Sequence, residues 1–500
     1  MNPLEYYSLE QLKARTSEKW RNYDSDVLPL WVAEMDVKLP DPLVNFLTKT
    51  IEIGDVGYLS NSNFERYVKS FTDFTARHWH WEQPWDVIAD VEDVVSGCRR
   101  VIDAWLEHDS NNSVIVSTPV YPPFINKYTR GYTYVDVPLT CSTSANVTPT
   151  GSDRVVENWL TIPDSHSQAR SESGPLEPNL SPPHPKDGIA SDKKLSEPYR
   201  PDFEKLEVAF GAATADDKRA VYALCNPANP SGSAFTEEEL SQLAKLANQY
   251  GVLVVSDEIH GPLVTERNFE HSGHHLNECP NPANHGRHSA FVPYLSVPEA
   301  GFAVAVTSAS KAFSIPGMKA ALVVPSTDSR AIDLINNSGH FGKATSEHIG
   351  ALAQTTCFEE CDDWLFHLVQ AIRNNLAYFE TLLKQYFPLA KYIKPQGTYF
   401  AWVDFSAYFD PEVHARYLDA TVPELALTTE PSKYFLQQAK VALNPGRTFA
   451  LQQHLKWNGM PLDETVQDIK TPYDYFVRIN LATSQEIIRQ ALERMAESLV

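Results

Sequence analysis

One lysine, Lys311, has the surroundings of a reactive amine. It follows an apolar segment at 302–307 (FAVAVT) in a turn of small residues that contains Ser308 and Ser310, and Lys319 comes eight positions later. An amine in apolar company loses its proton readily, and the neutral amine attacks a carbonyl carbon. The hydroxyls and the second ammonium group could hold a phosphate. For Lys311 taken alone, an exposed lysine is the commoner interpretation.

Three further polar residues stand where the pattern predicts that strands end. The sequence NPANPSG at 226–232 predicts a turn from which the Asn229 amide can donate to an oxygen anion. Asp257, in SDEIH at 256–260, can keep a ring nitrogen protonated. Arg478 stands alone in an apolar strand, and its fork matches a carboxylate. The structural alternatives are a plain turn, a helix-capping carboxylate and a buried salt bridge.

Helical and strand patterns alternate along the chain and must position these residues. Short apolar strands are expected at 114–117, 220–224, 252–256, 302–307 and 397–404. Helices are expected at 41–55, 95–106, 236–250, 365–386 and 485–499. Asp41 is expected to cap the first helix and Thr236 to open the third with a capping box. Continuously apolar strands are typical of a mainly parallel sheet buried on both faces, so we expect an α/β fold with its chemistry at the carboxyl ends of the strands.

Length and pattern predict two domains. A large domain with a mainly parallel sheet flanked by helices is expected at 41–343, and a smaller α+β domain at 344–500, joined by the N-terminal segment 1–40. Four polar or irregular inserts are expected to interrupt them, at about 164–200, 267–293, 406–435 and 452–472. The insert at 267–293 is rich in histidine, but its spacing fits no compact metal site, so no metal is expected.

Composition excludes several classes of function. Hydrophobic residues make up 43% of the 500 residues, so the chain can bury a core. A net charge of −22 argues against nucleic acid as a partner. No apolar run is long enough to span a membrane, and the N-terminal residues do not resemble a secretory leader. Six scattered cysteines without a CxxC pair suggest reduced thiols, and we expect a cytoplasmic protein.

Together, the four motifs resemble those of the fold-type I enzymes that use pyridoxal 5'-phosphate (PLP), within the class I/II aminotransferase superfamily. A narrower resemblance points to the cystathionine β-lyase, or C–S lyase, branch. It rests on LPLWVAEMD at 28–36, on Gly57 and Tyr58, and on PGRTF at 445–449. Glu34 stands where that branch usually has Asp. The many inserts also resemble those of fungal secondary-metabolite members of the superfamily.

The resemblance implies a role for each matching residue. Lys311 would bond covalently to PLP and move the Cα proton, Asp257 would pair with the pyridine nitrogen, and Arg478 would bind the substrate carboxylate with the Ala33 amide. Tyr58 would reach the cofactor of a neighbouring subunit, which implies a homodimer. The remaining implied cofactor contacts are ring contacts from Asn229, His260 and Tyr121, and phosphate contacts from the Gly97 and Cys98 amides, Ser308, Ser310 and Lys319.

Two enzyme activities fit this set of residues. The first is β-elimination from an S-substituted cysteine, which releases a thiol, pyruvate and ammonia. The second is transamination by the same residues, and the two differ in where the Cα proton goes after Lys311 removes it. A third interpretation, a PLP-fold scaffold without activity, does not account for the joint presence of Lys311, Asp257, Asn229 and Arg478.

Overall fold

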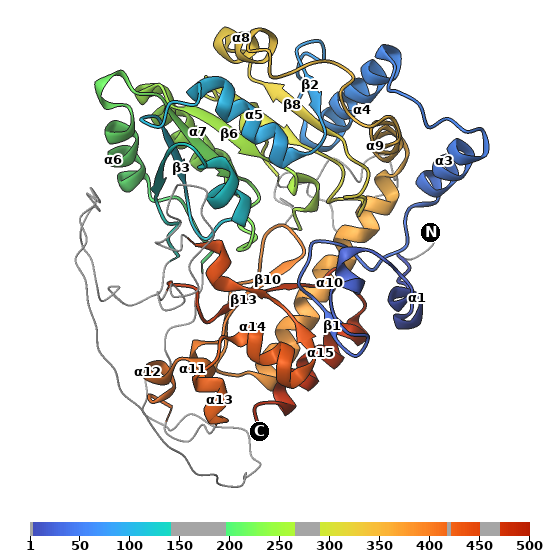
Figure 1. The fold of residues 1–500 in the computed structure, drawn as a ribbon, viewed down its shortest axis with the longest axis vertical. Coiled ribbons are helices and arrows are strands. Elements are labelled where there is room, and N and C mark those ends of the chain that lie inside the picture. The colour runs from blue at the N-terminus through green and yellow to red at the C-terminus, as the bar shows by residue number, and fades with distance from the viewer. Residues whose placement is uncertain (1–3, 142–196, 266–290, 418–421, 451–470) are drawn as a thin grey trace, which may run out of the picture.

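The computed structural model describes residues 4–141, 197–265, 291–417, 422–450 and 471–500 (Figure 1). Three of the expected inserts lie outside the described residues except for their last few positions. The histidine-rich stretch His271–His288 is among the residues that are not described.

A seven-stranded sheet forms the centre of the larger body, in the order β2-β8-β7-β6-β5-β3-β4. The five strands from β7 to β4 are parallel, whereas β8 is antiparallel to β7 and to β2. The strands are β2 (Ala89–Val91), β3 (Ser113–Val116), β4 (Thr133–Asp136), β5 (Ala220–Cys225), β6 (Leu253–Asp257), β7 (Ala303–Thr307) and β8 (Ala321–Pro325). This confirms the α/β class, and strands β6 and β7 are buried along their whole length, as their apolar sequences predict. Strand β8 is also buried throughout, although the sequence analysis did not predict a strand there.

A smaller sheet lies among the C-terminal elements, below the larger body in Figure 1, in the order β12-β13-β10-β9. Its strands are β9 (Lys391–Tyr392), β10 (Phe400–Asp404), β12 (Asn444–Pro445) and β13 (Phe476–Asn480). The N-terminal segment joins this part through β1 (Leu28–Pro29), which pairs in parallel with β11 (Val441–Ala442). The domain boundaries at 40 and 343 stay a prediction.

Helices surround both sheets (Figure 1). In the larger body they are α3 (Asp41–Glu52), α4 (Asn61–Trp79), α5 (Val94–Leu106), α6 (Phe203–Ala213), α7 (Glu237–Tyr250), α8 (Ser329–Asn337) and α9 (His348–Glu360). In the N- and C-terminal parts they are α1 (Leu9–Lys13), α2 (Glu18–Arg21), α10 (Asp362–Tyr386), α11 (Ser406–Phe409), α12 (Pro411–His414), α13 (Glu424–Leu427), α14 (Pro431–Tyr434) and α15 (Gln485–Glu497).

The helix ends test the capping predictions. The capping box of α7 is present, with Thr236 and Glu239 bonded reciprocally. The prediction for α3 was wrong by one residue. Pro40 is the N-cap and Asp41 is the first helical residue, so Asp41 contributes its charge at the positive helix end but does not cap the helix through its side chain.

The described parts of the expected insert at 406–435 are residues 406–417 and 422–435, and both contain short helices. Phe409, Tyr434 and Phe435 in it are almost fully buried and pack in the same core cluster as α10 and α15. Among the described residues, no helix is long and apolar enough to cross a membrane. Five of the six cysteines are described, and all five are free thiols.

Candidate active site

The polar residues of the four motifs meet at one edge of the central sheet. Strands β5, β6 and β7 are neighbours and parallel, and Cys225, Asp257 and Val306 lie side by side in register. The turn with Asn229 follows β5, Asp257 ends β6, and the turn with Lys311 follows β7. The carboxyl ends of parallel strands form one edge, so residues far apart in the sequence become neighbours there.

Lys311 has the environment of an amine that exchanges its proton near neutral pH. Its Nζ donates to the Ala33 carbonyl at 3.4 Å. Removal from water, and then the positive charge of Arg478, lower the pKa of Lys311 to about 8, while the carboxylate of Glu34 opposes the shift. The prediction of a reactive lysine thus gains a physical cause.

Asp257 is a buried carboxylate held by the protein through one backbone group. Its Oδ1 accepts from the Ile259 amide at 3.2 Å. Burial raises the pKa of Asp257 to about 7, against the weaker effects of this hydrogen bond and of Lys311. Among the described residues Asp257 forms no ion pair within 4.0 Å, so a cationic N–H brought by a ligand would stabilise its charged form.

The other three ring contacts predicted from the sequence are His260, Asn229 and Tyr121. His260 is buried, its Nδ1 has no hydrogen-bond partner among the described residues, and burial lowers its pKa, so the ring is neutral. The Oδ1 of Asn229 accepts from Arg478 at 2.9 Å, which leaves its NH₂ group free to donate elsewhere. Tyr121 is half-buried, and burial raises its pKa, against the smaller effect of the Arg478 charge.

Arg478 is a buried cation without an acidic partner. Its side chain lies over the ring of Phe400 at 4.1 Å, and its second terminal nitrogen donates to the Trp31 carbonyl at 2.8 Å. Burial lowers its pKa to about 10. Nε has no hydrogen-bond partner in the described part of the chain. The salt-bridge alternative therefore fails within the described residues, and an anionic ligand would meet an unsatisfied guanidinium.

The expected phosphate contacts are only partly arranged as the sequence suggested. Lys319 is half-exposed at the N-terminus of α5, where its Nζ lies 3.4 Å from Asp93. Gly97 is the fourth residue of α5, and its amide donates to the Asp93 carbonyl at 2.9 Å, so it is not free to bind phosphate. Cys98, one position later, likewise lies inside the helical hydrogen-bond ladder.

The reason for a glycine at position 97 is packing rather than phosphate binding. A Cβ there would lie 2.8 Å from the side chain of Val306, so the glycine lets α5 approach the sheet. The first amides of an α-helix have no partner within the helix, so those of Val94 and Val95 are available for an anion. The Ser96 amide is not, because it donates to the Asp93 carboxylate at 2.9 Å.

The two serines of the Lys311 turn differ. The Ser308 hydroxyl donates to the Ala320 carbonyl at 2.8 Å and accepts from the Ser310 amide at 3.1 Å, so it shapes the turn. The hydroxyl of Ser310 is half-buried and remains a candidate phosphate contact.

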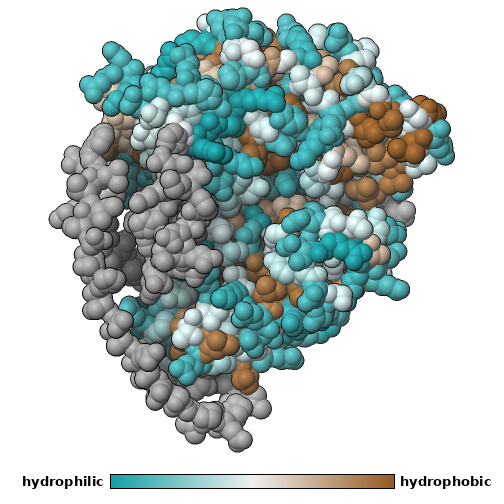
Figure 2. Space-filling view, viewed as in Figure 1, coloured by the Kyte–Doolittle hydropathy of each residue, from teal (hydrophilic) through white to brown (hydrophobic). Residues whose placement is uncertain are grey.

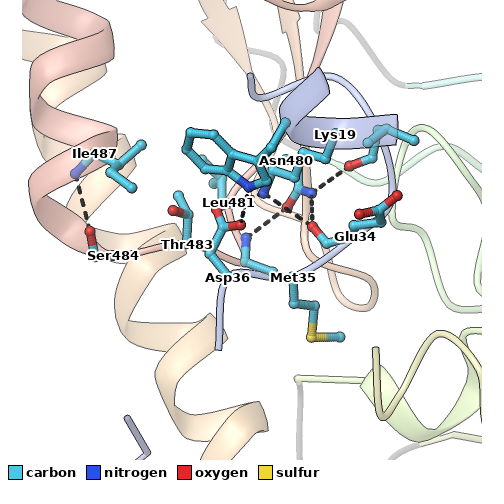
Figure 3. Close-up of polar contacts among 12 residues, drawn as sticks. Lys19, Glu34, Met35, Asp36, Asn480, Leu481, Thr483, Ser484 and Ile487 are labelled. Atoms are coloured by element: carbon cyan, nitrogen blue, oxygen red, sulfur yellow. Dashed lines mark hydrogen bonds and ion pairs between the residues drawn. The ribbon is translucent and has the colours of Figure 1, made fainter. Parts of the chain in front are cut away.

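The N-terminal motif at Trp31–Asp36 is pinned by long-range polar contacts (Figure 3). Asp36 accepts from Lys19 Nζ at 2.7 Å and from Trp20 Nε1 at 2.9 Å, and all three side chains are buried. The amide of Asn480 donates to the carbonyls of Val32 and Glu34 at 2.6 and 2.7 Å. These bonds hold the backbone of Ala33 against Lys311.

A second hydrogen bond joins this motif to the turn that contains Lys311. The Met35 amide donates to the Ser314 hydroxyl at 3.0 Å, and Ser314 has a positive φ of 55°. Lys19, Asn480 and Ser314 were not singled out from the sequence, because a single Lys, Asn or Ser carries no local signal for a partner 17 to 448 residues away.

Tyr58 lies apart from the residues above. Its side chain is 100% exposed in the turn between α3 and α4. It therefore cannot act in the site of its own chain in this conformation, and its predicted role depends on a neighbouring subunit.

The residues at the sheet edge fit PLP. A half-buried lysine with a lowered pKa suits the aldehyde, a buried carboxylate without an ion pair suits the pyridinium, and the unpartnered nitrogen of His260 faces the same space. A helix N-terminus with Lys319 beside it suits the phosphate. The Asp93 carboxylate at this helix end would repel a phosphate, but the charge of Lys319 and the free amides of the first turn offset that repulsion.

Comparisons with known proteins agree with this assignment. A family model for aminotransferase class I and II matches residues 193–495. A putative cystathionine beta-lyase of Mycobacterium tuberculosis is 34% identical over 508 residues, covering 100% of this chain and 98% of the relative. A cystathionine beta-lyase of Corynebacterium glutamicum is 23% identical over 496 residues, covering 99% and 100%.

Solved structures show the same fold. A putative PLP-dependent beta-cystathionase from Corynebacterium diphtheriae superposes with a TM-score of 0.67 at 23% identity, covering 99% of this chain and 98% of that one. Cystalysin from Treponema denticola, which contains PLP, gives a TM-score of 0.66 at 20% identity, with 99% and 98% covered. The chain belongs to the fold-type I PLP-dependent enzymes of aminotransferase class I and II, in their cystathionine β-lyase branch.

Proposed function

We propose that this enzyme is a C–S β-lyase that cleaves S-substituted cysteines to a thiol, pyruvate and ammonia. The observation that carries the proposal is full-length similarity to proteins named as cystathionine β-lyases, in a chain that keeps Lys311, Asp257, Asn229 and Arg478 together at one sheet edge. The substrate class follows from the names of these relatives and from the buried cation of Arg478, which supports a carboxylate-bearing substrate.

PLP, when bound, supplies the electron sink that makes the Cα proton of an amino acid acidic enough to remove. The protein decides what happens to that proton. With a pKa near 8, the neutral amine of Lys311 can take the proton from Cα, and the resulting ammonium group can release it again at working pH. Asp257 holds the proton of the ring nitrogen, because a carboxylate next to a cation favours the charged form.

Arg478 and the pinned N-terminal motif orient the substrate. The guanidinium offers two parallel donors to the carboxylate, and binding there would replace its bonds to Asn229 and Trp31. Elimination needs nothing further from Lys311 before the C–S bond breaks, whereas transamination needs it to deliver the proton to the cofactor.

The test is turnover of cystathionine by the PLP-loaded protein without any keto acid. We expect thiol, measured with a thiol reagent, and pyruvate, measured with lactate dehydrogenase, in equal amounts. Lys311→Ala should abolish both. Turnover that requires a keto-acid acceptor and releases no thiol would show an aminotransferase instead, the activity for which the matched family is named.

We also infer a homodimer in which Tyr58 reaches the cofactor of the neighbouring subunit. An exposed apolar patch supports this: Val44, Ile51, Ile53, Val56 and Tyr58 are 43%, 66%, 67%, 59% and 100% exposed, over α3 and the turn after it. Figure 2 shows this surface as a brown area at the upper right, where Figure 1 places α3. Patches of this kind mark protein interfaces.

A cytoplasmic setting belongs to the same proposal. It is supported by the free thiols of the five described cysteines, because oxidising compartments convert paired thiols to disulfides.

A further inference from the structure

Tyr399 has a buried hydroxyl that no group in the described residues satisfies. Its side chain is 0% exposed, and its Oη has no hydrogen-bond partner there. Buried hydroxyls normally find a partner, because leaving one unpaired costs the hydrogen bond that water would have made. Other tyrosines share this property, among them Tyr392, which is half-buried with its hydroxyl oxygen buried, so the unpaired hydroxyl alone does not mark a site.

Backbone strain distinguishes Tyr399 from the others. The residue before it, Thr398, is fully buried and has a φ of 67°. A β-branched residue at positive φ is an outlier, and such strain persists only where the surroundings over-determine it. Here Gly397 donates to the Gly232 carbonyl at 2.8 Å, and the Tyr399 carbonyl accepts from Leu481 at 2.8 Å. Backbone hydrogen bonds on both sides thus hold Thr398 in its strained conformation, and this conformation sets the direction of the Tyr399 side chain.

The direction of the Tyr399 side chain is toward the candidate active site. Its ring meets the ring of His260 edge-on at 6.0 Å. Burial raises the pKa of Tyr399, and the charges of Arg478, Glu34 and Tyr121 also act on it. The phenol therefore keeps its proton at neutral pH and is a hydrogen-bond donor.

In the described part of the chain, three buried donors on residues of this site lack an acceptor: the Tyr399 hydroxyl, Nε of Arg478 and Nε1 of Trp31. A carboxylate is acceptor-only and has room for several donors on its two oxygens. We propose that the Tyr399 hydroxyl donates a hydrogen bond to the carboxylate of the amino-acid substrate held by Arg478. The proposal rests on the proposed function only in requiring an amino-acid substrate, whether it is cleaved or transaminated.

The experiment titrates PLP-loaded wild type, Tyr399→Phe and Tyr392→Phe with L-alanine, which has no leaving group, and follows the cofactor absorbance. Tyr399→Phe should bind L-alanine about 10-fold more weakly, the loss expected for one hydrogen bond to a charged acceptor. Tyr392→Phe, which removes an equally unpaired hydroxyl on β9 of the same sheet, should bind as wild type does. Circular dichroism and thermal melts establish that both variants are folded.

Ethylamine, which is L-alanine without its carboxylate, distinguishes a carboxylate contact from a general effect. Tyr399→Phe should bind ethylamine as tightly as wild type. Steady-state kinetics should show KM raised by a similar factor for S-substituted cysteines of any size, with kcat nearly unchanged, because the bond serves binding. An unchanged affinity for L-alanine, an equal loss for ethylamine, or a KM effect confined to large S-substituents would each overturn the proposal. L-alanine binding needs no C–S cleavage, so the two proposals can fail separately.

Discussion

Lys311 and Asp257 show how one physical cause prepares two groups for opposite tasks. Desolvation disfavours the charged form of each, so the pKa of Lys311 falls to about 8 and that of Asp257 rises to about 7. In the cofactor-free protein both shifts cost stability. The aldehyde and ring nitrogen of PLP would relieve both, so cofactor binding would be favourable at the same two residues to which we assign the chemistry.

The pH dependence of the cofactor-free protein tests Asp257. Its pKa is raised from 3.8 unfolded to about 7 folded, so the folded state binds more protons between these values. The contribution of Asp257 to the free energy of unfolding is therefore fully present below pH 4 and is lost as the pH rises through 7. Asp257→Asn lacks this loss, so its melting temperature should exceed that of wild type at pH 8 and approach it at pH 4.

The control for this prediction is Asp216→Asn, at a carboxylate that is 88% exposed, which should follow wild type at each pH. Differential scanning fluorimetry without PLP measures all three proteins. Parallel curves for Asp257→Asn and wild type from pH 4 to 8 would contradict the buried, shifted carboxylate.

At the scale of elements, short helices and loops rather than long helices align the site. The four-residue helix α2 brings Lys19 and Trp20 onto Asp36, and Asn480 at the end of β13 holds the same segment (Figure 3). Isolated helices of this length are unstable, so the position of α2 depends on these buried contacts. The contacts in turn fix the Ala33 carbonyl beside Lys311.

Breaking the buried pair should therefore cost both stability and substrate binding. Asp36→Asn leaves Lys19, which is 0% exposed, without its charge partner, and losing one member of a buried pair typically costs about 3–5 kcal/mol. Urea unfolding followed by fluorescence should show a lower midpoint, and KM should rise because the Ala33 segment loosens.

The matched control is Glu5→Gln, which removes the partner of Lys38 in an exposed pair next to the same segment. Its urea midpoint should stay at the wild-type value, because solvent screens exposed pairs. Equal, small effects of the two substitutions would show that the Lys19–Asp36 pair does not hold the motif.

At the scale of the whole molecule, the feature that matters is the apolar surface over α3. Tyr58, on a turn beside Ile53 and Val56, is fully exposed and lies outside the site of its own chain, but in the proposed dimer it would reach the site of the second copy. The proposed dimer would bury the patch and exclude water from the cofactor phosphate.

Two substitutions separate assembly from cofactor contact. Ile53→Asp places a charge in the middle of the proposed interface, so gel filtration with light scattering should give a monomer that loses PLP on dialysis. Tyr58→Phe should remain dimeric and folded but retain PLP more weakly, because only one hydroxyl contact is removed. A wild-type protein that is monomeric yet holds PLP tightly would contradict the shared site.

The sequence alone determined the local features. Apolar runs ending in polar turns predicted β5, β6 and β7 and placed Asn229 and Asp257 at the strand ends. This works because a strand buried on both faces consists of consecutive apolar residues. Position in the chain did not reveal which amides are free. Gly97 read as a phosphate contact, whereas its place in α5 commits its amide to the helix and its missing side chain to packing against Val306.

Only the tertiary structure decided the pairings between distant residues. The bonds of Lys19 to Asp36 and of Arg478 to Asn229, and the direction of Tyr399, join segments from 17 to 249 residues apart or depend on a strained backbone that no local pattern specifies. Local composition determines strands, turns and helices, because those bonds form between near neighbours. The depth of burial and the missing partners, which give Lys311 and Arg478 their chemistry, exist only once the chain has folded.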